Sequence, residues 1–184
     1  MQRYRATRIV AALAAGMFFG PLARGDDGVV AGHWEKRQHD LNYVGVTSIY
    51  SCDGLRDEIK MLLRAAGARA DVDVHVTCSN PFEGPSRITD ANVTFYALVP
   101  GAAGEAPAAG AWRRVDFRPG EPAWLTEGDC ELVAQFAKDL LPLLTTRGVE
   151  NHVNCVPHET VVGSLRLRFE TLALVPKPRP ARTQ

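Results

Sequence analysis

Two similar stretches of sequence, each running from one cysteine to the next, decide the predicted fold. The first is Cys52–Cys78, which ends in VDVHVTC, and the second is Cys130–Cys155, which ends in VENHVNC. When the opening cysteines are aligned, Arg69 falls on Arg147 and the apolar helical positions coincide. After one deleted residue the closing cysteines coincide as well. Self-similarity of this kind indicates an internal duplication.

Each copy has the pattern of one strand, one helix and two further strands. Apolar residues recur at helical spacing after each opening cysteine, and strict alternation before each closing cysteine is typical of a half-buried strand. Ser51 or Asp53 is expected to cap the first helix and Gly67 to end it, while Pro142 should kink or end the second. The predicted strands are 43–51, 72–78 and 92–99 in the first copy, and 112–117, 149–155 and 165–174 in the second.

The predicted fold class is therefore α+β, with two tandem β-α-β-β repeats in one mixed or antiparallel sheet. Both helices are expected on one face, because either repeat alone would leave that face uncovered. We expect a single domain over residues 26–184, with repeats at about 43–99 and 112–174. A linker rich in glycine, alanine and proline occupies 100–111, and a disordered tail occupies 176–184.

The first 25 residues have the features of a cleavable signal peptide. Arg3, Arg5 and Arg8 precede an apolar run over residues 9–19, and small residues lie before a cleavage site predicted after Gly25. The run is shorter than the ~20 residues that a membrane span needs, and no later stretch is apolar enough to span. The sequence predicts export to the periplasm, with no transmembrane segment after cleavage.

The charge balance argues against a nucleic-acid partner. The chain has 21 basic and 21 acidic residues, and loss of the four arginines in residues 1–25 leaves 17 basic against 21 acidic residues, a net charge of −4. A mildly acidic protein has no general electrostatic attraction for nucleic acid.

All four cysteines lie after the predicted leader, where oxidation is the default. Four cysteines allow three pairings, and the duplication selects Cys52–Cys78 and Cys130–Cys155. Each bridge would close a loop of about 26 residues. In the chain-entropy model such a bridge stabilises the folded state by about 3.5 kcal/mol. The alternative, a metal site, lacks the close Cys-x-x-Cys or Cys/His spacing of zinc modules.

Strand alternation places a set of polar residues on the sheet face away from the helices. His75 and His152 occupy equivalent positions there, so two imidazoles with nearby carboxylates could bind zinc or copper. The other interpretation is an ordinary solvated sheet face that contacts a partner. The polar residues of this predicted partner face are Asp73, Thr77, Glu150, Asn154, Arg166 and Arg168.

Motifs for catalysis are absent from the sequence. There is no Gly-x-Ser-x-Gly elbow, no phosphate-binding glycine loop and no His-Glu-x-x-His helix, so we predict no catalytic residues and no cofactor. A small hydrolase-type enzyme that uses the open sheet face is the third hypothesis, after partner binding and metal binding.

The segments Tyr50–Leu55 and Leu63–Arg69 resemble parts of small exported bacterial proteins of unknown function. That resemblance implies export and the first helix, and no activity. The sequence therefore predicts a non-catalytic binding or assembly protein, whose partner is an envelope protein, a peptide or a second copy of itself.

Overall fold

The computed structural model describes residues 28–77, 85, 87–101 and 107–175. The predicted signal peptide, Cys78 and the predicted tail at 176–184 lie outside these residues. Along the chain the elements are β1 (Val30–Val44), α1 (Cys52–Ala65), β2 (Asp73–Thr77), β3 (Ile88–Pro100), β4 (Pro107–Phe117), α2 (Cys130–Gln135), β5 (Thr146–Asn151) and β6 (Leu167–Leu174).

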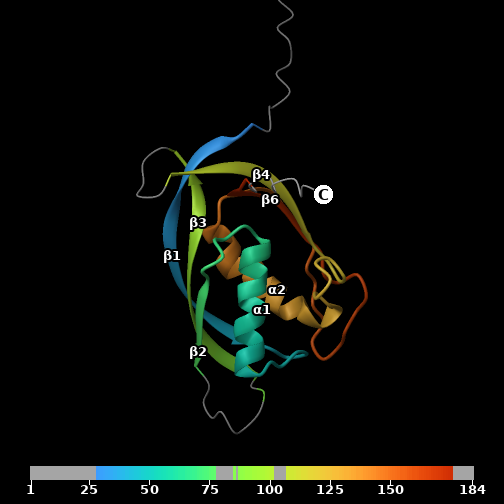
Figure 1. Cartoon of the computed structure of the whole chain (residues 1–184). Coiled ribbons are helices and arrows are strands. Elements are labelled where there is room, and N and C mark those ends of the chain that lie inside the picture. Colours follow the sequence, from blue (N-terminus) through green and yellow to red (C-terminus); the bar gives the residue numbers. More distant parts are fainter. Residues whose placement is uncertain (1–27, 78–84, 86, 102–106, 176–184) are drawn as a thin grey trace, which may run out of the picture.

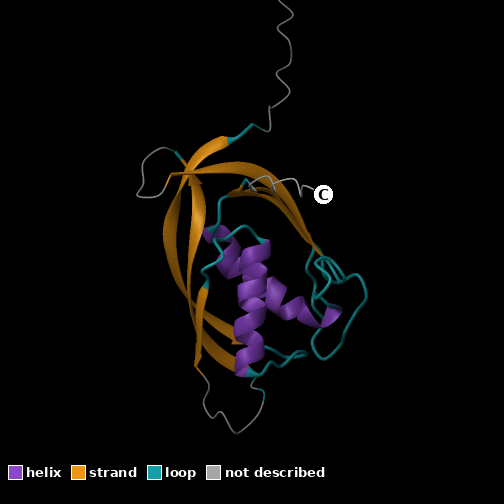
Figure 2. Ribbon diagram, in the orientation of Figure 1, coloured by secondary structure: helices purple, strands orange, loops and turns teal. Residues whose placement is uncertain are grey.

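The strands form one six-stranded antiparallel sheet in the order β2-β3-β1-β4-β6-β5. The predicted α+β class and single sheet are confirmed. Strands β1 and β4 pair only where Val30–His33 meets Pro107–Gly110, a contact that we call the corner. The sheet therefore consists of a first half-sheet (β2-β3-β1) and a second half-sheet (β4-β6-β5) that meet at one end. Figures 1 and 2 show the sheet arching over both helices.

Two glycines allow the strands to approach closely at the corner. A Cβ atom on Gly32 would lie 2.8 Å from the carbonyl oxygen of Val99, and one on Gly110 would lie 2.7 Å from Cδ2 of Leu98. A Cβ on Gly110 would also lie 3.0 Å from Cδ1 of Leu172, and both leucines are fully buried. The corner is thus packed too tightly for side chains at these two positions.

Helix α1 begins and ends where the sequence predicts. The Ser51 hydroxyl caps it by accepting a hydrogen bond from the Gly54 amide at 3.1 Å. The helix ends before Gly67, whose φ of +100° is readily adopted only by glycine. Its buried face consists of Leu55, Ile59, Leu62 and Leu63.

The second helix is less regular than α1. It follows a short 3₁₀ turn (Glu127–Asp129), and α2 passes into a π-helical turn (Phe136–Leu140) and then a 3₁₀ turn (Leu141–Leu143). Pro142 lacks an N–H group and its ring clashes with a preceding carbonyl, so a regular helix cannot continue through it. The last helical turn ends at Leu143, directly after Pro142, near the predicted position, but the regular part of the helix already ends at Gln135.

One hydrophobic core joins both helices to the concave side of the sheet. Its large, fully buried members include Tyr43, Phe95, Phe117, Phe136 and Phe169. Phe117 packs edge-on against both Phe136 and Phe169, with ring centroids 5.9 and 5.7 Å apart. Among the helices of the described residues, none is long and apolar enough to cross a membrane.

Several predicted strand boundaries were wrong. β3 begins at Ile88 rather than at residue 92, and β4 begins at Pro107 rather than at residue 112, so residues 107–111 of the predicted linker belong to a strand. The first strand is not 43–51 but Val30–Val44, and the chain after Val44 turns to give backbone amides to Glu131. Before Leu41, the concave positions of β1 include the charged residues Glu35 and Arg37. The strand therefore lacks the alternation of apolar and polar residues by which a half-buried strand is predicted. The strand predicted at 149–155 is Thr146–Asn151, although the His152 and Asn154 amides still donate to carbonyls of residues 166 and 164.

Candidate functional site

A cavity lined by residues of both half-sheets lies between the C-terminal end of α1 and the corner. It has a volume of about 610 Å³, and we call it the Trp–Arg groove. Most of its lining side chains are small or apolar, with two tryptophans and three arginines among them. The lining residues are Trp34, Arg64, Gly67, Ala68, Arg69, Ala70, Ala111, Trp112, Arg113, Ala173 and Leu174.

Arg69 is fixed at one side of the groove by a carboxylate and two aromatic rings. It forms a two-point ion pair with Asp71, with both nitrogen–oxygen distances 2.6 Å. Its guanidinium carbon lies 3.6 Å from the Tyr96 ring centroid and 5.8 Å from that of Trp34. Hydrogen bonding to Arg69 lowers the pKa of the Asp71 carboxyl. Arg69 thus remains charged and in place beside Trp34.

The other two arginines bind the end of α1. Arg113 donates to the carbonyl oxygen of Ala65 at 2.7 Å, and Arg64 donates through Nε to that of Ala70 at 3.0 Å. These bonds satisfy carbonyls at and just beyond the helix end and oppose its partial negative charge. Each guanidinium has five N–H donors, so each keeps donors for another anion. A groove with an apolar lining and fixed cations suits a ligand with an apolar body and an anionic group.

The structure divides the predicted partner face between two parts of the sheet. Asp73 and Thr77 are exposed on β2. The other residues of the predicted face belong to the second half-sheet and its flanking segments. Arg168 of β6 forms an ion pair with Glu150 of β5 at 3.1 Å, Arg166 directly precedes β6, and Asn154 lies just beyond the end of β5. The predicted set is therefore not one continuous patch, because β2 and β5 lie at opposite ends of the sheet order.

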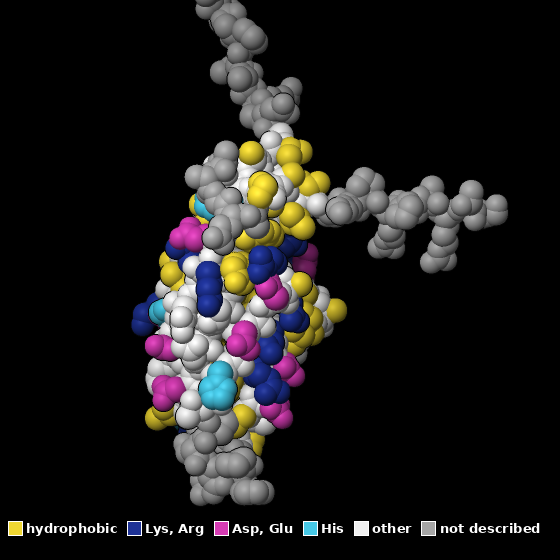
Figure 3. Space-filling view, turned by 60° about the vertical axis from the view of Figure 1, so that its left-hand side comes forward, with side chains coloured by type: hydrophobic (Ala, Val, Ile, Leu, Met, Phe, Trp, Pro, Cys, Tyr) yellow, Lys and Arg dark blue, Asp and Glu magenta, His cyan; other side chains and the backbone are white. Residues whose placement is uncertain are grey.

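Asp116 lies at the centre of the charged group on the second half-sheet. One of its carboxylate oxygens accepts from Arg166 and from Arg168, each at 3.2 Å. Burial alone would raise the pKa of Asp116, but the hydrogen bonds from the two arginines lower it below its usual value. Neighbouring Arg114 forms no ion pair within the described residues. On the face drawn in Figure 3, basic and acidic side chains are intermingled, and hydrophobic ones gather near the start of β1.

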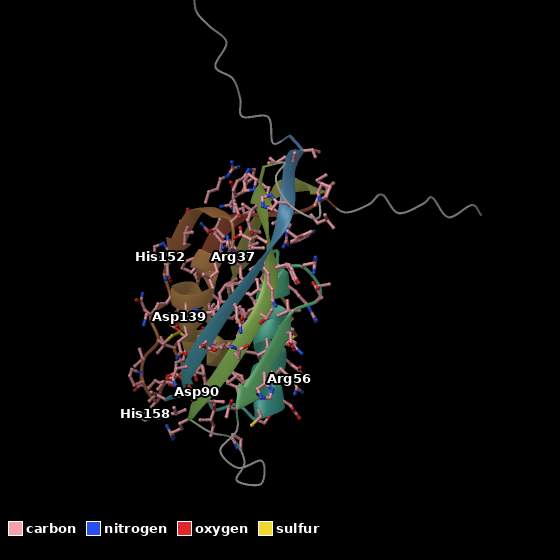
Figure 4. The ribbon with its side chains drawn as sticks, turned by 90° about the vertical axis from the view of Figure 1, so that its left-hand side faces the viewer. Arg37, Arg56, Asp90, Asp139, His152 and His158 are labelled. Atoms are coloured by element: carbon pink, nitrogen blue, oxygen red, sulfur yellow. A yellow bond between two sulfur atoms is a disulfide. The ribbon has the colours of Figure 1, made fainter. Side chains whose placement is uncertain are left out.

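His75 and His152 are both exposed, but they belong to distant strands. His75 lies on β2, and His152 directly follows β5 at the other end of the sheet order. Figure 4 shows His152 on the opposite side of β1 from β2. The described residues contain no group of three or more His, Cys, Asp or Glu side chains placed to hold a metal ion. A metal site that combines the two histidines is thus without a third ligand from the described part of the chain.

A separate polar cluster joins the starts of the two helices. The buried Asp129 carboxylate accepts from the Tyr50 hydroxyl and from the amide and hydroxyl of Thr126, the last two at 2.7 Å. Burial, followed by the nearby charge of Asp129, raises the pKa of Glu58 to about 7. Tyr50, Thr126 and Asp129 satisfy one another, whereas one buried carboxylate oxygen of Glu58 has no hydrogen-bond partner within the described residues. None of these residues lines the Trp–Arg groove.

The structure contains the predicted Cys130–Cys155 disulfide, whose Cα atoms are 5.7 Å apart. Cys52 is also disulfide-bonded, and Cys78, its predicted partner, lies outside the described residues. Cys52, Cys130 and Cys155 are therefore unavailable as nucleophiles or metal ligands in the oxidised protein.

The tryptophans of the groove were missed by the sequence analysis, although the sequence contains a signal for them. Ala31–Trp34 reads AGHW and Ala109–Trp112 reads AGAW, at the same offset of 78 residues that separates Cys52 from Cys130. Extending the comparison upstream of the cysteines would have found both tryptophans. Comparison of the chain with protein-family models, with curated proteins and with solved structures finds no match.

Proposed function

We propose that this protein is an exported, non-catalytic binding protein that holds its ligand in the Trp–Arg groove. The observation that carries the proposal is the combination of Trp34 and Trp112 with three fixed arginines around a cavity of about 610 Å³. A cavity of this size falls in the range that small-molecule sites occupy. The ligand we propose has an apolar body and a carboxylate, such as a fatty acid or the C-terminal end of an apolar peptide.

The polar cluster at the helix starts supports a non-catalytic role. Its two carboxylates are those of Glu58 and Asp129, and Asp129 already accepts hydrogen bonds from Tyr50 and Thr126. A general acid or base must reach a bound substrate. Because these residues lie away from the groove, they suit a structural role at the helix junction.

We also propose that the chain is a tandem duplication and that the groove lies where the two copies meet. Arg69 lies over Trp34 at 5.8 Å, and Arg147, which is 78 residues later, lies over Trp112 at 4.2 Å. The strand pairing at the corner has matching symmetry, because Val30 pairs with Gly110 and Gly32 pairs with Ala108. The first copy would then supply Trp34 and Arg69 to the groove, and the second would supply Trp112 and Arg113.

Export to the periplasm is supported by two observations. The first 25 residues have the composition of a signal peptide. The Cys130–Cys155 disulfide is typical of proteins from oxidising compartments.

Binding of decanoate, followed by tryptophan fluorescence, tests the proposed ligand chemistry. Two of the three tryptophans line the groove, so a bound ligand should change the emission. Decanol, which has the same body without the charge, should bind at least tenfold more weakly, because the arginines then gain no ionic partner.

Arg113→Gln should weaken decanoate binding about tenfold or more, the loss expected when a charged hydrogen bond of ~1.5–3 kcal/mol is removed. Arg114→Gln is the matched control, because Arg114 adjoins Arg113 on β4 but does not line the groove. Saturable binding that is unchanged in Arg113→Gln would place the ligand elsewhere. Absence of saturable binding below about 1 mM would refute the proposed ligand class.

A further inference from the structure

Strand β1 has a long stretch of edge without a neighbouring strand. Within the described residues, β4 covers β1 on the side opposite β3 only as far as His33, and Gly32 pairs there with Ala108. At the other end, the side-chain amide of Gln135 takes a strand's place, since it bonds both the N–H and the C=O of Val44, at 3.3 and 2.9 Å. The open stretch lies between these two points.

The direction of the backbone N–H and C=O groups identifies the open residues, by which we mean those whose backbone groups face the unpaired edge. The Ala31 carbonyl accepts from Gly101 and the Gly45 amide donates to Arg87, so odd-numbered residues of β1 direct their backbone groups toward β3. By alternation, the even-numbered residues direct theirs to the opposite side. Within the described residues these groups have no partner between Gly32 and Val44, and Figure 4 shows β3 and β2 on one side of β1 only. The open residues are Trp34, Lys36, Gln38, Asp40 and Asn42.

We propose that this edge is a self-association surface on which the β1 strand of a second copy adds in antiparallel orientation. The open stretch is bounded by Gly32 and Val44, and its midpoint is Gln38. An identical strand centred on the partner's Gln38 would therefore match both limits. Five residue pairs that exchange two hydrogen bonds each would continue the first half-sheet across the two molecules.

The charges along the edge are self-complementary in this register. Lys36 would lie opposite the partner's Asp40, and because the interface is two-fold symmetric the same pair would form twice. Both side chains are exposed on the convex face, and neither forms an ion pair within its own molecule among the described residues. Opposite charges directly across an antiparallel pair stabilise it, and like charges destabilise it.

The concave face of the edge is compatible with the same register. Arg37 would lie opposite the partner's His39, and its charge is already neutralised by Glu35 at 2.9 Å. Inward-pointing charges also occur on edges that remain unpaired in monomeric proteins. A monomer is accordingly the result that would overturn the proposal.

Sedimentation velocity of the purified, oxidised protein over a concentration series tests the interface. We expect a reversible dimer at tens of micromolar protein. Lys36→Asp and Asp40→Lys should each lower the association constant at least tenfold, because each places like charges opposite one another at two positions. Lys60→Asp on α1 is the control and should leave the association constant within twofold of the wild type.

Mixing the two single variants provides the decisive measurement. A heterodimer of Lys36→Asp with Asp40→Lys restores opposite charges at both positions, so the mixture should dimerise although neither variant does alone. Gln38→Cys should also form an intermolecular disulfide, because paired residues of this type lie ~5.5 Å apart, within disulfide range. Thr94→Cys, opposite Gln38 on β3, should not.

Several results would overturn the inference. A protein that stays monomeric up to about 500 μM would do so, as would a dimer that neither charge reversal weakens. Failure of the mixed variants to associate would refute the antiparallel register. Arg113→Gln should leave dimerisation unchanged, so failure of the proposed groove ligand can be distinguished from failure of this interface.

Discussion

Replacing Glu131 should destabilise the protein more than replacing any other exposed or half-exposed acidic residue. Glu131 lies in the first turn of α2, and its carboxylate accepts hydrogen bonds from three consecutive backbone amides of the loop between β1 and α1. The oxygen–nitrogen distances are 2.9 Å to Val46, 3.0 Å to Thr47 and 3.2 Å to Ser48. One side chain thereby satisfies a turn that lies more than 80 residues away in sequence.

A hydrogen bond to a charged group contributes ~1.5–3 kcal/mol, and an amide left without an acceptor carries a similar penalty. The three bonds share one carboxylate and the loop is partly exposed, so they do not add fully. We expect Glu131→Ala to lower the free energy of unfolding by about 3 kcal/mol, which corresponds to about 6–12 °C in melting temperature for a protein of this size.

Equilibrium urea unfolding followed by circular dichroism measures this loss. Glu131→Gln retains one acceptor oxygen without the charge and should lose about half as much stability. Glu159→Ala is the control, because Glu159 is exposed and its side chain makes no polar contact within the described residues. If Glu131→Ala lay within about 0.5 kcal/mol of the wild type, the three amides would not depend on this carboxylate.

Three further predictions concern other parts of the structure. Since burial and then Asp129 raise the pKa of Glu58 from 4.5 to about 7, stability should fall as pH rises from 4.5 to 7; Glu58→Gln should flatten this fall in pH-dependent melts. Gly32→Ala, whose Cβ would lie 2.8 Å from the Val99 carbonyl oxygen, should cost about 1–3 kcal/mol in urea unfolding, and an unchanged midpoint would contradict the packing at the corner. Calorimetry with zinc and copper should detect no binding tighter than about 1 mM, because His75 and His152 lie on distant strands; tight binding lost in either alanine variant would restore the metal hypothesis.

Local patterns in the sequence were enough to predict the helices and much of the sheet. Ser51 and Gly67 bound α1 because capping and positive φ are decided by neighbouring residues. The helical turns that follow α2 end at Leu143, directly after Pro142, for a similarly local reason. The Cys130–Cys155 bridge was predicted from the similar cysteine spacing of the two stretches rather than from any single residue.

The positions of β1 and of the Trp–Arg groove depend on tertiary contacts. They could not be predicted from the alternation of apolar and polar residues along the sequence. In β1, Glu35 and Arg37 lie on the concave side beyond the reach of the core, so the strand lacks the apolar alternation that normally identifies one. The predicted partner face was divided because sheet order, which strand alternation does not reveal, separates β2 from β5. The arginines of the groove come from α1, from the turn that follows it and from β4, and only the folded chain brings them together.

The corner also determines where the described chain enters and leaves the fold. Val30 pairs with Gly110, and the Val175 amide donates to the carbonyl of the adjacent Ala109 at 3.0 Å, so both ends meet on neighbouring residues of β4. Proteins whose ends lie close together commonly tolerate circular permutation. A short linker between these ends, with new termini opened within residues 102–106, would place β4, α2, β5 and β6 first in the chain. Such a permutant would keep every strand pairing while reversing the order in which a ribosome makes the two half-sheets.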